Sequence, residues 1–250
     1  MAHYDFRSPR LFVAAPLAAG LTVALDAAQI HYLATVLRRV AGDSVLVFNG
    51  TDGEWSARLA GTGRRDLILV VEDITRIQPD GGRLHYLFSP LKRARLDYMV
   101  QKAVEMGVST LHPVIMRHTQ AERVNLDRMR ANAIEAAEQC GILTIPQIAA
   151  PQDFTTAITA LGAACHLIFC DEDAPCGDPV AAVRADLHTC GYVDIAVLIG
   201  PEGGFGEEER AALVRRSHTS RIALGPRILR ADTAAVAALA VVQTAAGDWR

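Results

Sequence analysis

The chain has 250 residues, half of them hydrophobic, and a formal net charge of −3. This length accommodates one large domain or a large and a small one, with ample apolar surface for a buried core. No run of about 18 uncharged apolar residues occurs, which argues against a membrane span, and the first residues lack the apolar centre of a signal peptide.

Residues 1–76 predict a small domain that is mostly β. Four apolar stretches have the length and flanking turns of strands: 11–13, 44–48, 54–59 and 67–71. The turn-rich segment 49–53 predicts a hairpin between the second and third. Asp26 can cap a helix that ends at Arg38 and Arg39. The apolar positions of that helix fall on one face: Ile30, Leu33, Val36 and Leu37.

Residues 77–82 are polar and contain one proline and two glycines, so we expect a linker there. Beyond it, predicted strands alternate with predicted helices. The strands are 84–88, 108–114, 164–170, 193–199 and 221–224. The helices are 92–106, 125–139, 179–187, a segment that opens at Gly206, and 233–246. Strands separated by helices indicate an α/β domain with a parallel sheet, which we expect to occupy residues 83–250.

Positive charge is concentrated in residues 83–130, which hold nine Lys and Arg against four Asp and Glu. Within the predicted helix 92–106, Lys92, Arg95 and Lys102 project from one side. The opposite side carries Leu96, Met99, Val100 and Ala103, which we expect to be buried. The basic side is either a solvated helix face or a surface that contacts nucleic-acid phosphates.

Two predicted strands each end in a Gly-Pro loop that leads into a helix. The first loop is Gly200-Pro201-Glu202-Gly203-Gly204-Phe205, followed by three glutamates that suit a helix N-terminus. The second is Gly225-Pro226-Arg227-Ile228-Leu229-Arg230, followed by the cap-type residues Asp232 and Thr233. Ligands of open α/β sheets bind at the carboxyl ends of strands, where such loops gather.

The first loop does not have the composition of a phosphate-binding loop. It lacks the Lys-Ser/Thr pair of a Walker motif and the spacing of a dinucleotide-binding fold, and Glu202 would repel a phosphate. A ligand with an adenine and a ribose but no phosphate fits better. On these residues alone, two tight turns in an ordinary α/β domain remain the alternative.

The paired segments IGPEGGF and LGPRILRADTA resemble the cofactor-binding motifs of SPOUT-class RNA methyltransferases. They are most similar to the branch that methylates N3 of a uridine in 16S ribosomal RNA, the ribosomal RNA small subunit methyltransferase E family. Further resemblance lies in RLFV at 10–13, HYLATVLR at 31–38, and the pattern K-x-x-R-x-D-x-x-x-Q-K-x-x-E-x-G-V from Lys92. The chain departs from the family at Ile142, where the family usually has arginine.

The resemblance implies a SPOUT-type parallel sheet with a C-terminal trefoil knot, preceded by a PUA-like β-barrel that binds RNA. It implies S-adenosylmethionine as cofactor, 16S ribosomal RNA or the small ribosomal subunit as substrate, and no metal. Ten residues are expected at the cofactor: Leu198, Gly200, Pro201, Gly203, Gly204, Leu224, Gly225, Ile228, Leu229 and Thr233. Six are expected at the RNA: Arg10, Arg38, Lys92, Arg95, Lys102 and Arg123.

Two residues are expected to take part in the chemistry. The N3 proton of uracil must leave before or during methyl transfer, and a positive group would stabilise the resulting anion. We assign that role to Arg230, and we assign proton acceptance or contact with the nucleobase to Glu202. An equally weighted alternative for Glu202 is a cap on the following helix.

The five cysteines form no C-x-x-C pair, so we expect free thiols in a reducing cytoplasm and no zinc site. The final predicted helix is apolar almost all round, which favours burial and a homodimer that completes the active site. In that interface Ala234, Ala238 and Ala245 would permit close approach, and Leu239 and Val242 would cross a second helix. Two other functions stay open: methylation of a ribose 2′-hydroxyl, and a non-catalytic RNA-binding or ribosome-assembly factor.

Overall fold

The computed structural model describes residues 5, 8–63, 66–120, 123–175, 177–188 and 194–249. Two of the five cysteines, Cys176 and Cys190, lie outside them. The chain divides into two compact units. Unit 1 comprises Met1–Gly81 and Ile134–Ile145, and unit 2 comprises Gly82–Ala133 and Pro146–Arg250. The division after Gly81 falls inside the predicted linker, but unit 1 also takes a segment that we expected in the second domain.

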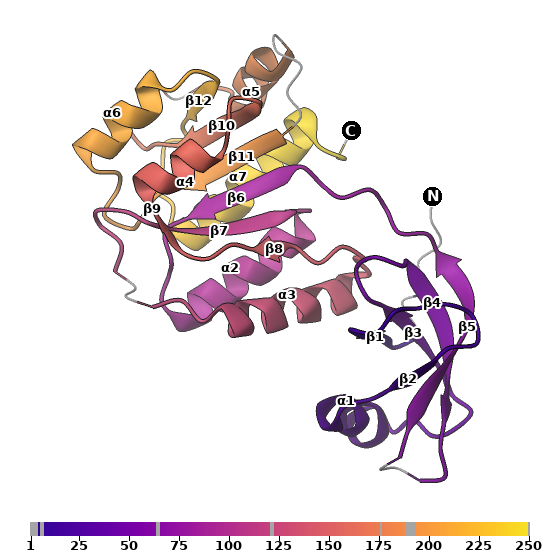
Figure 1. The fold of residues 1–250 in the computed structure, drawn as a ribbon. Coiled ribbons are helices and arrows are strands. Elements are labelled where there is room, and N and C mark those ends of the chain that lie inside the picture. Colours follow the sequence, from indigo (N-terminus) through magenta and orange to yellow (C-terminus); the bar gives the residue numbers. More distant parts are fainter. Residues whose placement is uncertain are drawn as a thin grey trace. The chain divides into compact units, whose positions relative to one another are not determined.

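Unit 1 is built on a five-stranded sheet (Figure 1). Its strands, in spatial order, are β1 (Arg10–Phe12), β3 (Ser44–Phe48), β4 (Glu54–Ala60), β5 (Ile68–Arg76) and β2 (Thr22–Ala24). β1 and β3 are parallel, and the other neighbours are antiparallel. The predicted hairpin of β3 and β4 is confirmed, whereas the sequence did not indicate β2. One side of the sheet buries an aliphatic core that includes Leu33, Val45, Val47, Leu59 and Leu69.

The helix of unit 1 begins as predicted but does not continue as predicted. Asp26 accepts a hydrogen bond from the backbone N–H of Gln29 at 2.8 Å, so it caps α1 (Ala27–His31). The chain then forms a π-helix over Tyr32–Val36. A π-helix has more residues per turn than an α-helix, so the 3.6-residue periodicity no longer predicts the buried face. Val36, which the periodicity places on the same face as the buried Leu33, is 58 % exposed.

Arg10, predicted to contact RNA, is buried in unit 1 and has a structural role. Its Nε lies 2.6 Å from Oε2 of Glu54, which also accepts from Arg76 Nη2 at 2.7 Å. Arg10 further donates to the backbone carbonyls of Asp5 and Glu138. With only 4 % of its side chain exposed, Arg10 is not available to a phosphate. The prediction for this residue was wrong.

Unit 2 contains a parallel sheet, as the alternation of strands and helices predicted. Its strands, in spatial order, are β12 (Thr219–Ile222), β10 (Cys165–Cys170), β11 (Asp194–Ile199), β6 (Leu84–Phe88), β7 (Thr110–Ile115) and β8 (Gln147–Ile148). The short β9 (Gln152–Asp153) also pairs with β7. All carboxyl ends of these strands lie at one edge, because every pairing is parallel.

Helices cover both faces of this sheet (Figure 1). α4 (Phe154–Ala160) and α6 (Glu207–Arg215) pack on the face that carries Leu87, Val114 and Leu198. On the other face, α7 (Ala231–Ala246) contacts β11 and lies against α2 (Arg93–Glu105) and α5 (Pro179–His188). α3 (Leu126–Cys140) begins in unit 2 and ends in unit 1. Among the described residues, no helix is both long enough and apolar enough to cross a bilayer.

The start of α7 differs from the prediction. Arg230 has an extended backbone and is the N-cap, so Asp232 and Thr233 lie in the first helical turn and not in the cap. The carboxylate of Asp232 still suits this position, because a helix N-terminus favours negative charge.

The burial of α7 corrects the residues assigned to a dimer interface. Ala238, Leu239 and Val242 are at most 1 % exposed within the single chain, and Ala245 is also buried. These residues are therefore part of the core of unit 2 and cannot cross a second helix. The part of α7 that stays half-exposed carries Val236, Ala237, Ala240 and Val241.

Candidate functional site

Three loops meet at the carboxyl edge of the sheet in unit 2. Because β10 lies between β12 and β11, the loop after β10 lies between the two Gly-Pro loops. The sequence indicated the loops at 200–206 and 223–230, but it did not indicate that residues 171–174 separate them. Strand order, which the sequence did not reveal, thus adds a third loop to the candidate site.

A cavity of about 200 Å³ opens between the loops that follow β10 and β12. The loop after β12 contributes 223–229, and the end of β10 with its loop contributes Cys170, Asp171, Glu172 and Ala174. Four of the expected cofactor residues line this cavity: Leu224, Gly225, Ile228 and Leu229. Gly225 has a left-handed φ of 104°, and a Cβ there would meet no atom within 4 Å, so its backbone faces open space. The lining combines apolar residues with two carboxylates, Asp171 and Glu172, and the guanidinium of Arg227.

The first Gly-Pro loop is tightly packed, and its glycines permit that packing. A Cβ on Gly200 would lie 3.0 Å from the ring of Phe205, and one on Gly203 would lie 3.1 Å from Cβ of His118. Gly204 has a φ of 73°, and its Cβ would lie 3.0 Å from Oε1 of Glu172. The loop therefore contacts the segments that hold His118 and Glu172 at distances tighter than most Cβ contacts.

The remaining expected cofactor residues lie around these loops in different environments. Leu198 is fully buried in the core, so its side chain cannot reach a ligand. Pro201 is buried in the first Gly-Pro loop, and Thr233 is exposed in the first turn of α7. These three residues do not line the cavity.

Two arginines hold the loop after β10 in place. The carboxylate of Asp171 is fully buried and lies 3.0 Å from Nη2 of Arg210 and 2.8 Å from Nε of Arg221. Arg210 also lies 2.5 Å from the carboxylate of Asp173.

Burial raises the pKa of Cys170 to about 12, so this thiol stays protonated and is a poor nucleophile.

A second, much smaller hollow lies where β6, β7 and β11 end. Its volume of about 10 Å³ is close to that of one water molecule, and its lining includes Ser89, Lys92, His118 and Glu202. Nδ1 of His118 lies 3.0 Å from the carbonyl oxygen of Gly204. A carbonyl can only accept, so Nδ1 carries the proton and Nε2 is free to accept one. The sequence did not single out His118.

Glu202 forms an ion pair with Arg95 of α2. It does not cap the following helix, because the N-cap of α6 is Gly206, whose N–H donates to the side chain of Glu209 at 2.8 Å. The capping alternative for Glu202 is therefore wrong. The ion pair instead joins Arg95, which we expect to contact RNA, to Glu202, which we expect to take part in methyl transfer.

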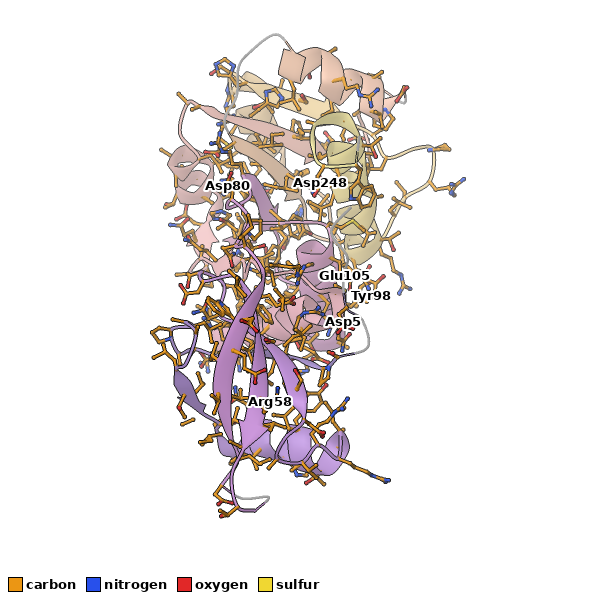
Figure 2. All side chains as sticks on the ribbon, turned by 90° about the vertical axis from the view of Figure 1, so that its right-hand side faces the viewer. Asp5, Arg58, Asp80, Tyr98, Glu105 and Asp248 are labelled. Carbon is orange, nitrogen blue, oxygen red and sulfur yellow. The ribbon has the colours of Figure 1, made fainter. Side chains whose placement is uncertain are left out.

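The two sides of α2 are as predicted. Leu96, Met99, Val100 and Ala103 are buried, as is Val104. On the other side, Nζ of Lys102 lies 2.7 Å from Glu105 and 5.6 Å from the ring centroid of Tyr98; both partners are labelled in Figure 2. Lys92, just before the helix, has no ion pair among the described residues. Lys92 is thus the most accessible positive charge of the predicted basic face.

Three more arginines expected at the site or the RNA are exposed. Arg38 in unit 1 follows the π-helix with a left-handed φ of 55°, which is unusual for a residue with a side chain. Arg123 in unit 2 precedes α3. Arg230 follows the cavity-lining segment 223–229, and in the described part of the chain its side chain has no ion pair. All three guanidinium groups can reach an external anion.

Two protein-family models match the chain. An RNA methyltransferase domain matches residues 78–243, and an RNA methyltransferase PUA domain matches residues 25–72. The first covers the parallel sheet and both Gly-Pro loops, and the second covers about half of unit 1.

Individual proteins show the same similarity over nearly the whole chain. The ribosomal RNA small subunit methyltransferase E of Rickettsia conorii is 31 % identical over 218 residues, which is 86 % of each chain. That of Buchnera aphidicola from Acyrthosiphon pisum is 28 % identical over 97 % of this chain and 95 % of its own. A crystal structure of the Neisseria gonorrhoeae enzyme bound to S-adenosyl methionine is 25 % identical, with a TM-score of 0.86 over 98 % of this chain and 100 % of that one.

Proposed function

Because the chain belongs to the RNA methyltransferase family, we propose that it methylates N3 of a uridine in 16S ribosomal RNA, with S-adenosylmethionine as methyl donor. Methylation of small-subunit ribosomal RNA follows from the relatives, and the atom follows from the resemblance of the two Gly-Pro motifs. The observation that carries the proposal is the cavity at the carboxyl edge of the sheet. Segment 223–229 of the second Gly-Pro motif lines this cavity, and so does Glu172, which lies close to Gly204 of the first motif.

The cavity has the chemistry that an adenosine-containing ligand requires. Leu224, Ile228 and Leu229 offer apolar contacts to a flat base, and the glycine-rich backbone can approach it closely. Glu172 shares the lining with the guanidinium of Arg227 and can accept hydrogen bonds from a nucleoside. S-adenosylmethionine, when bound, supplies an electrophilic methyl group on a sulfonium.

Two residues supply groups for the acceptor: Glu202 from the smaller hollow, and Arg230, which follows the segment that lines the cavity. We propose that Glu202, oriented by its ion pair with Arg95, accepts the N3 proton or contacts the base. Arg230 stabilises the uracil anion as it forms, since a positive group beside developing negative charge lowers the barrier. The base must leave any stack to present N3, and holding it in line with the methyl group contributes further to the rate.

RNA binds through residues of both units in this proposal. Lys92, Arg95, Lys102 and Arg123 contact phosphates from unit 2, and Arg38 does so from the PUA unit 1. We leave Arg10 out because it is buried. A substrate in the ribosome places the enzyme in the bacterial cytoplasm.

We also propose that the C-terminal segment forms the trefoil knot of the class and that the protein is a homodimer with a shared active site. The dimer would use the half-exposed side of α7, with Val236, Ala237, Ala240 and Val241, in place of the buried residues first assigned to it. This side is apolar, and its small residues permit the close approach of a second helix.

The deciding experiment mixes the protein with labelled S-adenosylmethionine and undermethylated small ribosomal subunits, and maps the modified nucleotide by digestion and mass analysis. Label on the base of one uridine supports the proposal, and label on a ribose 2′-oxygen would refute it. Binding of the cofactor without transfer to subunits or to naked RNA would favour a non-catalytic role.

A further inference from the structure

Glu172 is one of four ionisable residues that line the cavity, together with Cys170, Asp171 and Arg227. It follows Asp171 directly after β10, lines the cavity, and leaves 45 % of its side chain exposed. Its Oε1 lies 3.0 Å from the point where a Cβ on Gly204 would stand. The carboxylate thus lies between the loop after β12 and the first Gly-Pro loop, which are the two segments with the cofactor motifs.

The neighbouring carboxylates are already engaged, whereas Glu172 keeps most of its capacity to accept hydrogen bonds. Asp171 is bound by Arg210 and Arg221 at 3.0 and 2.8 Å, and Asp173 is bound by Arg210 at 2.5 Å. Glu172 lies 3.8 Å from Arg210, which is beyond hydrogen-bonding distance. The guanidinium of Arg210 offsets part of the negative charge of Glu172. Glu172 therefore interacts with a ligand mainly through two carboxylate oxygens that accept hydrogen bonds.

We propose that Glu172 accepts hydrogen bonds from the ribose hydroxyls of the adenosine moiety; this inference rests on the proposed function. A vicinal diol presents two donors, and a carboxylate presents two acceptor oxygens at a matching separation. A carboxylate at the carboxyl end of a sheet strand binds ribose in the same way in other open α/β proteins. The apolar residues Leu224, Ile228 and Leu229 of the same cavity then contact the base.

The left-handed φ of 73° already favours glycine at position 204, and this arrangement adds a steric reason. A side chain at position 204 would displace the carboxylate of Glu172, because their atoms would come within 3.0 Å. The absence of a side chain at Gly204 thus leaves room for the Glu172 carboxylate in the position that we propose for holding the sugar.

The test measures ligand binding to the full chain by calorimetry, with the variants Glu172→Ala and Glu172→Gln. Three ligands share the ribose: S-adenosylmethionine, S-adenosylhomocysteine and 5′-methylthioadenosine, the last of which has no amino-acid group. We expect Glu172→Ala to weaken all three by a similar factor of about 10 to 100, the range for hydrogen bonds to a charged group. The 2′-deoxy and 3′-deoxy forms of 5′-methylthioadenosine should bind the parent weakly and lose little more in the variant.

Asp173→Asn is the matched control. It removes a neighbouring carboxylate that also pairs with Arg210 but does not line the cavity, so affinities should change by less than about threefold. Unchanged affinities in Glu172→Ala would overturn the inference, and so would a loss that spares 5′-methylthioadenosine, because Glu172 would then meet the amino-acid group. If the parent bound none of the three ligands, the proposed cofactor itself would be wrong.

Discussion

The buried ion triad of unit 1 permits a prediction that separates structural from RNA-binding arginines. Glu54 is 3 % exposed and accepts from Arg10 at 2.6 Å and from Arg76 at 2.7 Å. The substitution Glu54→Gln would remove the negative charge that the buried Arg10 and the partly buried Arg76 share. Breaking a buried pair in this way costs about 3–5 kcal/mol. We expect unit 1 to lose this much stability, a large share of what a small domain has.

The assay is urea unfolding, followed by circular dichroism and by hydrogen exchange of backbone amides in unit 1. The control is Glu72→Gln, which breaks the exposed pair of Arg58 and Glu72, whose side chains are 55 % and 31 % exposed. An exposed pair contributes at most about 1 kcal/mol, so this variant should unfold almost as the parent does. Equal, small losses in both variants would refute the reasoning.

The pH dependence of the same group gives a second readout. Burial raises the pKa of Glu54, but hydrogen bonds from Arg76 and Arg10 outweigh it and leave the pKa below its ordinary value of 4.5. The ionised form therefore stabilises the fold above the unfolded pKa, and this contribution is lost as the pH falls through the folded value. Glu54→Gln should remove that part of the acid sensitivity.

Four further predictions follow from the site and the core. Lys92→Ala should reduce the slope of RNA affinity against salt by about one unit and leave cofactor affinity unchanged, as filter binding at several salt concentrations can measure. Arg230→Ala should lower kcat in the methylation assay without weakening S-adenosylmethionine binding, and equal losses in both would contradict its role. Nε2 of His112 lies 3.1 Å from Nδ1 of His85. Burial lowers the pKa of His112 from 6.5 to about 4, and the charge of His85 contributes a smaller part of this shift. The unfolded state therefore takes up the proton first, so stability should fall as the pH drops from about 6.5 to 4, and His112→Asn should flatten that decline in urea unfolding. Val241→Glu should give a folded monomer by light scattering if α7 forms the dimer interface, and an unchanged dimer would exclude that surface.

Local rules were enough to predict most elements and the outline of the site. Strand and helix periodicity indicated a parallel sheet, because each residue's preference depends on neighbours within a few positions. Asp26 was found as a cap for the same reason, since its partner Gln29 is three residues away. The two Gly-Pro motifs identified the family because a loop that approaches a ligand through its backbone requires glycine at particular positions.

Contacts between distant segments decided what those rules could not. The sequence indicated that Arg10 is available to RNA, but in the folded chain Arg10 forms an ion pair with Glu54, 44 residues away. The pairing of Arg95 with Glu202 spans 107 residues, and the place of Glu172 between two loops depends on the order β12-β10-β11. The apolar sequence of α7 predicted burial, but only packing showed that Leu239 and Val242 face their own core. The sequence by itself thus determined most elements and the ligand class. Side-chain partners, exposure and strand order are properties of the folded chain, because they depend on which distant residues the fold brings within a few ångströms.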